Sequence, residues 1–304
     1  MLLFFGFSKF SLRAHSKYFA NHMKQSKEDS AIAVWVVITA VGHPAYFSVA
    51  ELSVLSVLKH TSFSILLGVD LDEAPAWADH PRITTVLLEP RYGTGKRLPF
   101  LAKFETLSYL TQIVDKGLVL QMDADALMVR EIRRDMIESA LCKYEYAMVE
   151  QKQIIGSNND RAFFLEHYEN HSMVWFDSSD APEIDDFRFY NAGVVLFTIE
   201  SLVRFLPWSN SVIESKPDHH RVGKHMIGDQ DYLQFWVNNL NPQQCRELPW
   251  FWNHCEHWDA EFPRNGALIC HFSNFCNGPA PDAWDRMSSL LERNNQDRQV
   301  FNAD

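Results

Sequence analysis

GLVLQMDAD, residues 117–125, is the stretch of this sequence that decides the fold. Its largely apolar first part is typical of a strand that is buried on both faces, and such strands belong to parallel sheets covered by helices. Asp123 and Asp125 follow where that strand surfaces. Because side chains alternate along extended backbone, both carboxylates point to one side and can share one divalent cation.

The segments before this stretch alternate between predicted strand and predicted helix. Continuous apolar runs indicate strands at 31–39, 63–69 and 82–88. Helical spacing of apolar residues indicates helices at 44–60, opened by Pro44, and at 98–114. This alternation predicts an α/β fold with a mostly parallel sheet flanked by helices. Ligands of such sheets bind beyond the carboxyl ends of the strands, which is where the two aspartates lie.

The second half of the chain is less regular. Further strands are predicted at 193–199 and 267–271, and further helices at 200–215 and 229–240. The polar segment 156–187 has little pattern and is predicted to be a long loop over the site, either a lid or an acceptor-binding loop. The expected organisation is a leader at 1–30, a single domain at 31–290 with halves 31–125 and 126–290, and a tail at 291–304.

Composition limits the class of protein. A formal net charge of -11 over 304 residues argues against a nucleic-acid partner. Five cysteines, an odd number without a Cys-x-x-Cys pair, favour reduced thiols in the cytoplasm. The apolar run at 2–7 is interrupted by Lys9 and Arg13, too soon to span a bilayer and without the features of a signal peptide. Peripheral membrane contact through the N-terminus is left open.

Three Asp-x-Asp patterns occur, so the spacing alone does not identify a metal site. They are Asp70-Leu71-Asp72, Asp123-Ala124-Asp125 and Asp229-Gln230-Asp231. The first also follows an apolar run and leads into a predicted loop. The second is favoured by three later segments, Tyr190-Asn191-Ala192-Gly193-Val194, Gly228-Asp229-Gln230-Asp231 and Cys270-His271-Phe272.

The segment at 122–125 and these three later segments, in this order, resemble the motifs of retaining glycosyltransferases with the GT-A fold. The resemblance is greatest to glycosyltransferase family 8, which contains glycogenin and bacterial lipooligosaccharide galactosyltransferases, and it spans about residues 31–285. It implies a Rossmann-like fold for nucleotide-diphospho-sugar transfer. It also implies that Asp123, Asp125 and His271 hold Mn²⁺, or Mg²⁺, against a nucleotide diphosphate. A set that mixes imidazole with carboxylates suits Mn²⁺ better than Mg²⁺.

The resemblance also implies roles for residues around the metal. Asn191, Ala192, Asp229 and Gln230, together with Asp123 and Ala124, would bind the donor sugar. Gln230, Lys103 and Asp229 would form the catalytic set, with Lys103 stabilising the departing diphosphate. An amide such as Gln230 is a poor nucleophile, which favours same-face substitution through an oxocarbenium-like ion pair.

Each of these assignments has a simpler structural alternative. Asp229 could be only a helix N-cap, and residues 191–193 only a turn. Lys103 could be a solvated lysine on a helix surface, with Arg97 as the rival cation. His271 could be a core histidine whose ring bonds only to the protein.

The predicted activity is therefore a Mn²⁺-dependent, retaining transfer of a hexose from a UDP-sugar to a hydroxyl of a glycan or glycoconjugate. One alternative is a zinc metallohydrolase built from the histidine-rich region 219–257, where His254-x-x-His257 would supply two ligands. A second is a carbohydrate-binding protein of the same fold without catalysis, whose many aromatic residues would stack on sugars.

Overall fold

The computed structural model describes residues 32–88, 99–151, 160–216, 220–256, 262–263, 265–272 and 282–301. The predicted leader at 1–30, and with it the membrane contact, lies outside the described residues, as does Arg97. None of the helices within the described ranges is both long enough and apolar enough to cross a bilayer.

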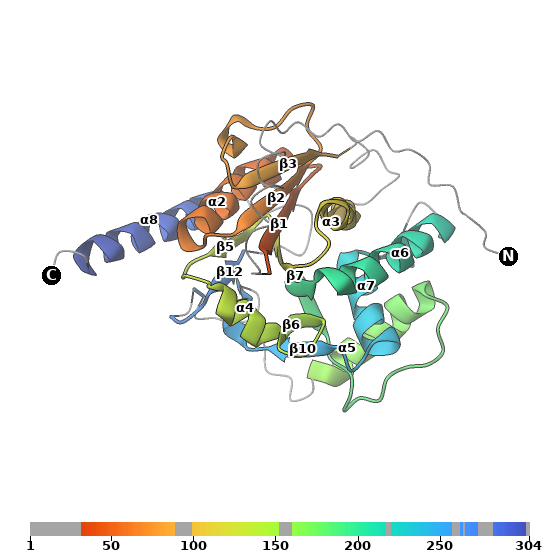
Figure 1. Ribbon diagram of the computed structural model, residues 1–304. Helices are drawn as coiled ribbons and strands as arrows, with labels where there is room; N and C mark the ends of the chain where they lie inside the picture. Colours follow the sequence, from red (N-terminus) through yellow and green to blue (C-terminus); the bar gives the residue numbers. More distant parts are fainter. Residues whose placement is uncertain are drawn as a thin grey trace.

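A seven-stranded sheet forms the centre of the molecule, with the order β10-β6-β7-β4-β1-β2-β3 (Figure 1). Its strands are β1 (Val34–Ala40), β2 (Ser64–Val69), β3 (Ile83–Leu87), β4 (Leu118–Asp123), β6 (Tyr146–Glu150), β7 (Tyr190–Thr198) and β10 (Cys245–Leu248). Strands β4, β1, β2 and β3 run parallel, and β7 is antiparallel to both of its neighbours. The prediction of an α/β fold with a mostly parallel sheet is confirmed.

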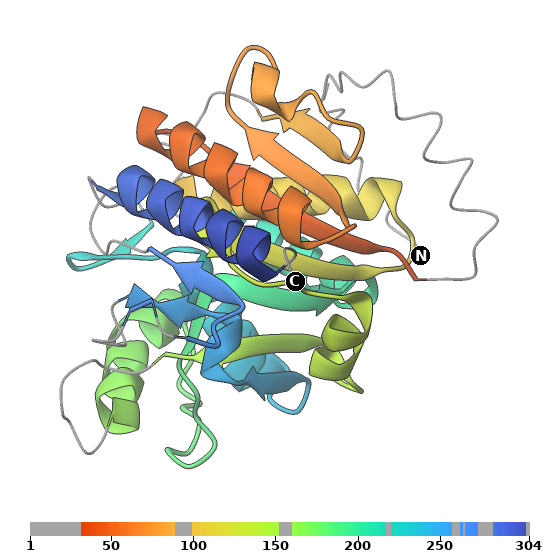
Figure 2. The same ribbon diagram turned by 90° about the vertical axis from the view of Figure 1, so that its left-hand side faces the viewer.

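Helices cover both faces of this sheet. On one face α2 (Pro44–His60) packs beside α8 (Ala283–Phe301), as Figure 2 shows, and on the other α3 (Ala102–Ile113) packs beside α6 (Ile199–Ser215). Alternate residues of β1 accordingly enter different cores: Val36 and Ile38 join the apolar cluster under α2, whereas Val37 joins the cluster under α3. Burial on both faces explains why the first strands are continuous apolar runs.

A small second sheet brings the late part of the chain to the end of β4. Its order is β11-β12-β5, with β5 at Ala126–Met128, β11 at His254–Cys255 and β12 at Ile269–His271. Strand β12 is antiparallel to β5, so that His271 pairs with Ala126, and the next amide, that of Phe272, donates to the carbonyl of Asp125 at 3.0 Å. Backbone pairing therefore fixes residue 271 beside the second aspartate.

The predicted loop at 156–187 is partly helical, so that prediction is corrected. Helix α5 spans Asp160–Tyr168 and continues into a π-helical turn at Glu169–Met173. Here Phe164, Tyr168, Met173, Phe187 and Phe189 bury themselves in a separate apolar cluster. The polar residues between them hide the helical spacing in the sequence.

The predicted tail from residue 291 is likewise helical as far as Phe301, because it continues α8, which packs on α2 through buried Ala283 and Met287. Three further elements are helix α4 (Arg134–Leu141), the hairpin β8–β9 (Arg221–Val222 with His225–Met226) and helix α7 (Asp229–Phe235). Helix α7 ends in a second π turn. The division into halves at residue 125 stays a prediction.

Candidate active site

Asp123, Asp125 and His271 converge at the carboxyl end of β4. One ligand atom from each lies within 4.8 Å of the others. The Nε2 atom of His271 is 3.6 Å from Oδ2 of Asp123 and 3.4 Å from Oδ1 of Asp125. These separations are longer than a normal hydrogen bond and are close to the roughly 3 Å between neighbouring ligands of a small divalent cation. The predicted metal ligands therefore lie together.

The ring of His271 is held in a cradle formed by Gly193 at the start of β7. A Cβ atom at residue 193 would lie 2.1 Å from Cε1 and 2.4 Å from Nδ1 of the imidazole, so only glycine leaves room for the ring. The Nδ1 atom is buried and has no nitrogen or oxygen partner among the described residues, and Cys255 of β11 lies next to the imidazole. A buried imidazole directed at two carboxylates fits a bound divalent cation.

The residues Asp123, Asp125 and His271 are called the metal triad. Within it, the charges of Asp125 and His271 act strongly on each other. Burial alone would lower the pKa of His271, but the carboxylate of Asp125 and then the thiol of Cys255 raise it well above its usual value. For Asp125, burial would raise the pKa, and the imidazole and Lys103 together hold it below its usual range. The carboxylate of Asp125 is therefore ionised and available to a cation.

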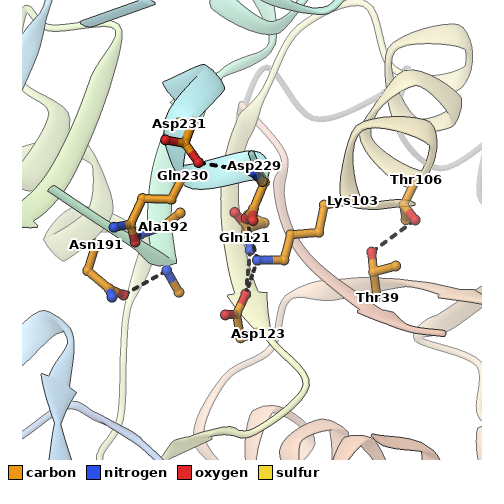
Figure 3. A network of polar contacts seen from close by, with 12 residues as sticks. Thr39, Lys103, Thr106, Gln121, Asp123, Asn191, Ala192, Asp229, Gln230 and Asp231 are labelled. Carbon is orange, nitrogen blue, oxygen red and sulfur yellow. Dashed lines mark hydrogen bonds and ion pairs between the residues drawn. The ribbon is translucent and has the colours of Figure 1, made fainter. Parts of the chain in front are cut away.

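Lys103 connects the metal triad to helix α7 (Figure 3). Its Nζ atom lies 2.5 Å from Oδ1 of Asp123 and 2.5 Å from Oδ2 of Asp229, and its side chain is only 13% exposed. Burial would lower the pKa of this amine, but the two carboxylates raise it. Burial also raises the pKa of Asp229, against the effect of Lys103. Lys103 is therefore a permanent buried cation and not a solvated surface lysine.

The predicted donor-binding residues form a second polar group beside this ion pair. The Gln230 side chain accepts a hydrogen bond from the backbone N–H of Ala192 at 3.3 Å and donates to Oε1 of Gln151 at 3.3 Å. The amide of Asn191 donates to the same oxygen at 3.5 Å, and its carbonyl accepts from Asn253 at 2.8 Å. In Figure 3, Asn191 and Gln230 lie on the same side of β4. Two amides thus present exchangeable hydrogen-bonding groups next to the metal triad.

The local alternatives for these residues are wrong in two cases. Gly228, not Asp229, is the N-cap of α7, and its N–H donates to Oδ2 of Asp231 at 2.9 Å. The carboxylate of Asp229 is used by Lys103 instead. Residues 191–193 lie within strand β7 and do not form a turn. Ala124 is buried in the short turn between β4 and β5, so it offers its backbone.

Several residues of the site had no signal in the sequence. Tyr46, in the first turn of α2, lies close enough to the carboxylates that its pKa is raised, first by burial and then by Asp125 and Asp123. Gln121 of β4 donates to Oδ1 of Asp123 at 3.3 Å, and Gln151 bridges the two donor-site amides. These Tyr and Gln residues are scattered along the sequence, and no spacing between them could have indicated that they lie in the site.

The other Asp-x-Asp pattern of the N-terminal half has a local role. Both carboxylate oxygens of Asp70 accept the N–H of Gly42, at 3.2 and 3.0 Å, and so join the loops that follow β1 and β2. Asp72 is exposed, and neither residue belongs to a metal-ligand group within the described ranges.

The histidines of the predicted zinc hydrolase do not converge where they are described. His254 is buried against Phe262, and His220 is buried against Trp175. The only member of that region in a metal-ligand group of the described residues is His225, whose partners come from another segment. His219 and His257 lie outside the described residues.

No protein-family model matches the sequence, and no curated protein matches it significantly. Solved structures do match. A galactosyltransferase, LgtC, in complex with donor and acceptor sugar analogues has a TM-score of 0.56 at 15% identity, over 85% of this chain and 95% of that chain.

Two further glycosyltransferases are similar. The bifunctional enzyme WbbM has a TM-score of 0.55 at 14% identity, over 90% of this chain and 52% of that chain. The enzyme GlyE of Streptococcus pneumoniae TIGR4 has a TM-score of 0.50 at 16% identity, over 86% of this chain and 63% of that chain. This chain has the GT-A fold. The fold predicted from the four motifs is thereby confirmed, and in this GT-A domain the acidic pair lies at the carboxyl end of β4.

Proposed function

We propose that this protein is a Mn²⁺-dependent, retaining glycosyltransferase that moves a hexose from a UDP-sugar to a hydroxyl of a glycan or glycoconjugate. The observation that carries the proposal is the convergence of Asp123 and Asp125 with His271 at the edge where ligands of open α/β sheets bind. The resemblance of the fold to LgtC, which was solved with donor and acceptor analogues, supports it.

The cation would be held by Asp123, Asp125 and His271. When bound, Mn²⁺ supplies positive charge that neutralises the diphosphate of the donor. One imidazole and two carboxylates suit Mn²⁺ better than Mg²⁺, which prefers oxygen ligands. The absence of further protein ligands among the described residues leaves room for phosphate oxygens and water.

Lys103 would stabilise charge on the leaving diphosphate. It is a buried amine beside Asp123. Its positive charge would therefore attract phosphate oxygens bound next to Asp123 and Asp125. The carboxylate of Asp229 holds this amine in place at 2.5 Å. Lys103 therefore needs no reorganisation when negative charge develops.

Asn191 and Gln230 would bind the hexose. Among the described residues, their side-chain NH₂ groups donate to the side-chain oxygen of Gln151, at 3.5 and 3.3 Å, and sugar hydroxyls could replace these long contacts. Gln230 is a weak nucleophile, and Asp229 is occupied by Lys103. Retention would then proceed on one face of the sugar through an oxocarbenium-like ion pair, with the departing diphosphate accepting the proton of the acceptor hydroxyl.

We also propose a cytoplasmic location. The four cysteines within the described ranges, Cys142, Cys245, Cys255 and Cys270, are all free thiols, which supports a reducing compartment. Contact of the N-terminal segment with a membrane surface is part of the same proposal.

A donor screen tests the function. Thermal stabilisation by UDP-, GDP- and CDP-hexoses is measured with and without Mn²⁺, followed by assay of nucleotide release. UDP-hexoses should stabilise the protein only with Mn²⁺ and should be turned over. Asp125→Ala should abolish both effects, whereas Asp72→Ala, which removes an exposed aspartate of the other Asp-x-Asp pattern, should change neither.

The outcomes separate the alternatives. Turnover by Asp125→Ala at saturating Mn²⁺ would refute the metal assignment. Stabilisation by a sugar nucleotide without turnover or transfer to any acceptor would favour a carbohydrate-binding protein over an enzyme.

A further inference from the structure

Three histidines gather at a second place, outside the active site. His167 lies near the end of α5, His171 in the π turn that follows, and His225 in strand β9. Their ring centroids are 4.5 Å apart for 167 and 171, 4.7 Å for 167 and 225, and 4.4 Å for 171 and 225. One nitrogen from each ring lies within 4.8 Å of the other two, and all three residues are partly exposed. A cation could therefore reach all three from solvent.

The π turn places and orients two of these rings. Residues four apart in such a turn lie nearly above one another, and single π turns are frequent at functional sites. The Nδ1 atom of His171 donates to the backbone carbonyl of His167 at 2.8 Å. This bond fixes the tautomer, so that Nε2 of His171 keeps a free lone pair. The backbone thus prepares an imidazole as a ligand.

The third ring faces a fixed carboxylate. Oδ1 of Asp231 lies 3.5 Å from Nε2 of His225, and this nitrogen is buried without a hydrogen-bond partner. Asp231 itself is held by Ser172, whose hydroxyl donates at 2.6 Å, and by the N–H of Gly228 at 2.9 Å. A carboxylate behind an imidazole is the arrangement that orients histidine ligands in metal sites.

Packing contacts alone do not explain why three histidine rings lie together here. Three imidazoles whose ring centroids lie 4.4 to 4.7 Å apart would repel one another if they were charged. Each neutral ring carries one lone pair, and one nitrogen of each ring lies within 4.8 Å of the other two, so the three nitrogens can share one cation. Phe189, whose ring is nearly perpendicular to that of His167 at a centroid distance of 6.1 Å, supplies no hydrogen-bond donor.

We propose that His167, His171 and His225 form a zinc site, with Asp231 as the carboxylate that orients His225. Three neutral imidazoles suit Zn²⁺, whereas Mn²⁺ and Mg²⁺ favour oxygen ligands. The fourth position would be water, since the rings are partly exposed. The site differs from a hydrolase centre in region 219–257, because two of its ligands come from the α5 segment.

The position of the site indicates its role. It joins the α5 segment to the β8–β9 hairpin, and that hairpin leads directly into α7, which carries Asp229 and Gln230. Bound zinc would cross-link the α5 segment, with its π turn, to the β8–β9 hairpin. This inference does not depend on the proposed transfer activity.

The test measures zinc stoichiometry and affinity in the full chain without a polyhistidine tag. After treatment with a chelator, the wild-type protein is titrated with Zn²⁺ against a competing chromophoric chelator. His171→Asn should bind one zinc ion fewer than the wild type, and Asp231→Asn should lose about 10- to 100-fold in affinity at that site. His80→Asn, at a histidine outside both metal-ligand groups of the described residues, should change nothing.

A second variant separates this site from the active site. Asp125→Ala should keep the zinc that His171→Asn loses, and the Co²⁺-substituted Asp125→Ala protein should show the intense visible absorption of a four-coordinate, nitrogen-rich site. This measurement holds even if His171→Asn fails to fold. Equal zinc stoichiometry in wild type and His171→Asn, or no zinc and no such spectrum in Asp125→Ala, would overturn the proposal.

Discussion

Gly193→Ala should abolish the proposed Mn²⁺ site although residue 193 is not one of its proposed ligands. The added Cβ would lie 2.1 Å from Cε1 and 2.4 Å from Nδ1 of His271. Carbon atoms in contact are normally about 3.5 to 4.0 Å apart, so the ring must move by more than about 1 Å. Metal sites tolerate errors of only about 0.2 Å in ligand distance, so His271 would no longer coordinate.

The expected effect is large on binding and moderate on stability. Mn²⁺ affinity should fall to the level of His271→Ala, and transfer should fall by about 100-fold or more, as for misplacement by about 1 Å in other sites. Overpacking should cost about 1 to 3 kcal/mol in the free energy of unfolding. Free Mn²⁺ can be measured by electron paramagnetic resonance, and stability by urea denaturation of the metal-free protein.

Two comparisons test the reasoning. Gly228→Ala places a Cβ at 3.6 Å from Phe100, an ordinary contact, and should leave Mn²⁺ affinity unchanged. In a His271→Ala background the imidazole is gone, so most of the stability cost of Gly193→Ala should disappear. If Gly193→Ala binds Mn²⁺ as the wild type does, or if its cost is the same in both backgrounds, the cradle does not position the ring.

Three further predictions follow from the charges and hydrogen bonds of the site. The raised pKa of His271, which Asp125 causes against the effect of burial, keeps the metal-free ring protonated at neutral pH. Mn²⁺ affinity should therefore rise between about pH 6 and pH 8 with release of a proton, as titrations in buffers of different ionisation enthalpy would show. Lys103→Met leaves two carboxylates without their buried cation and should destabilise the fold by about 3 to 5 kcal/mol in urea denaturation. Gln230→Ala should lower kcat without changing Mn²⁺ affinity, because within the described residues the hydrogen bonds of Gln230 go to Ala192 and Gln151 and not to a proposed metal ligand.

Each of these has a clear contrary result. A pH-independent Mn²⁺ affinity would mean that the ring is neutral in the metal-free protein. Because the pKa of His271 is raised in the folded protein, its ion pair with Asp125 stabilises the metal-free fold fully below about pH 6.5, the usual pKa of a histidine. This stability is lost as the pH rises through the raised pKa of His271. A cost below about 1 kcal/mol for Lys103→Met would place the amine in solvent. Weaker Mn²⁺ binding by Gln230→Ala would tie this residue to the metal.

The first half of the fold was predictable because its strands are buried on both faces. The apolar runs at 31–39, 63–69 and 117–122 overlap β1, β2 and β4, with ends that agree within three residues. Strands β5, β6 and β10 are three to five residues long, and their role depends on pairing with distant partners. Short segments of this kind carry too little periodicity to be recognised.

The convergence of Asp123, Asp125 and His271 was predictable because the segments that carry them resemble, in the same order, the motifs of a known family. The three-histidine cluster was not, because His167 and His171 lie in a segment without apolar pattern, and His225 follows more than 50 residues later. The same holds for Gln151 and Tyr46, which meet the site only through the tertiary fold. Sequence patterns reveal local geometry, whereas these groups form by convergence.

The pairing of β12 with β5 gives the active site an order of assembly in time. During synthesis the acidic pair leaves the ribosome about 150 residues before His271 does. At translation rates of about 5 to 20 residues per second, the wait is roughly 7 to 30 seconds. A nascent chain stopped anywhere in this interval already contains the four strands β1 to β4 of the large sheet, yet it lacks His271, so premature termination should yield fragments that cannot retain the cation.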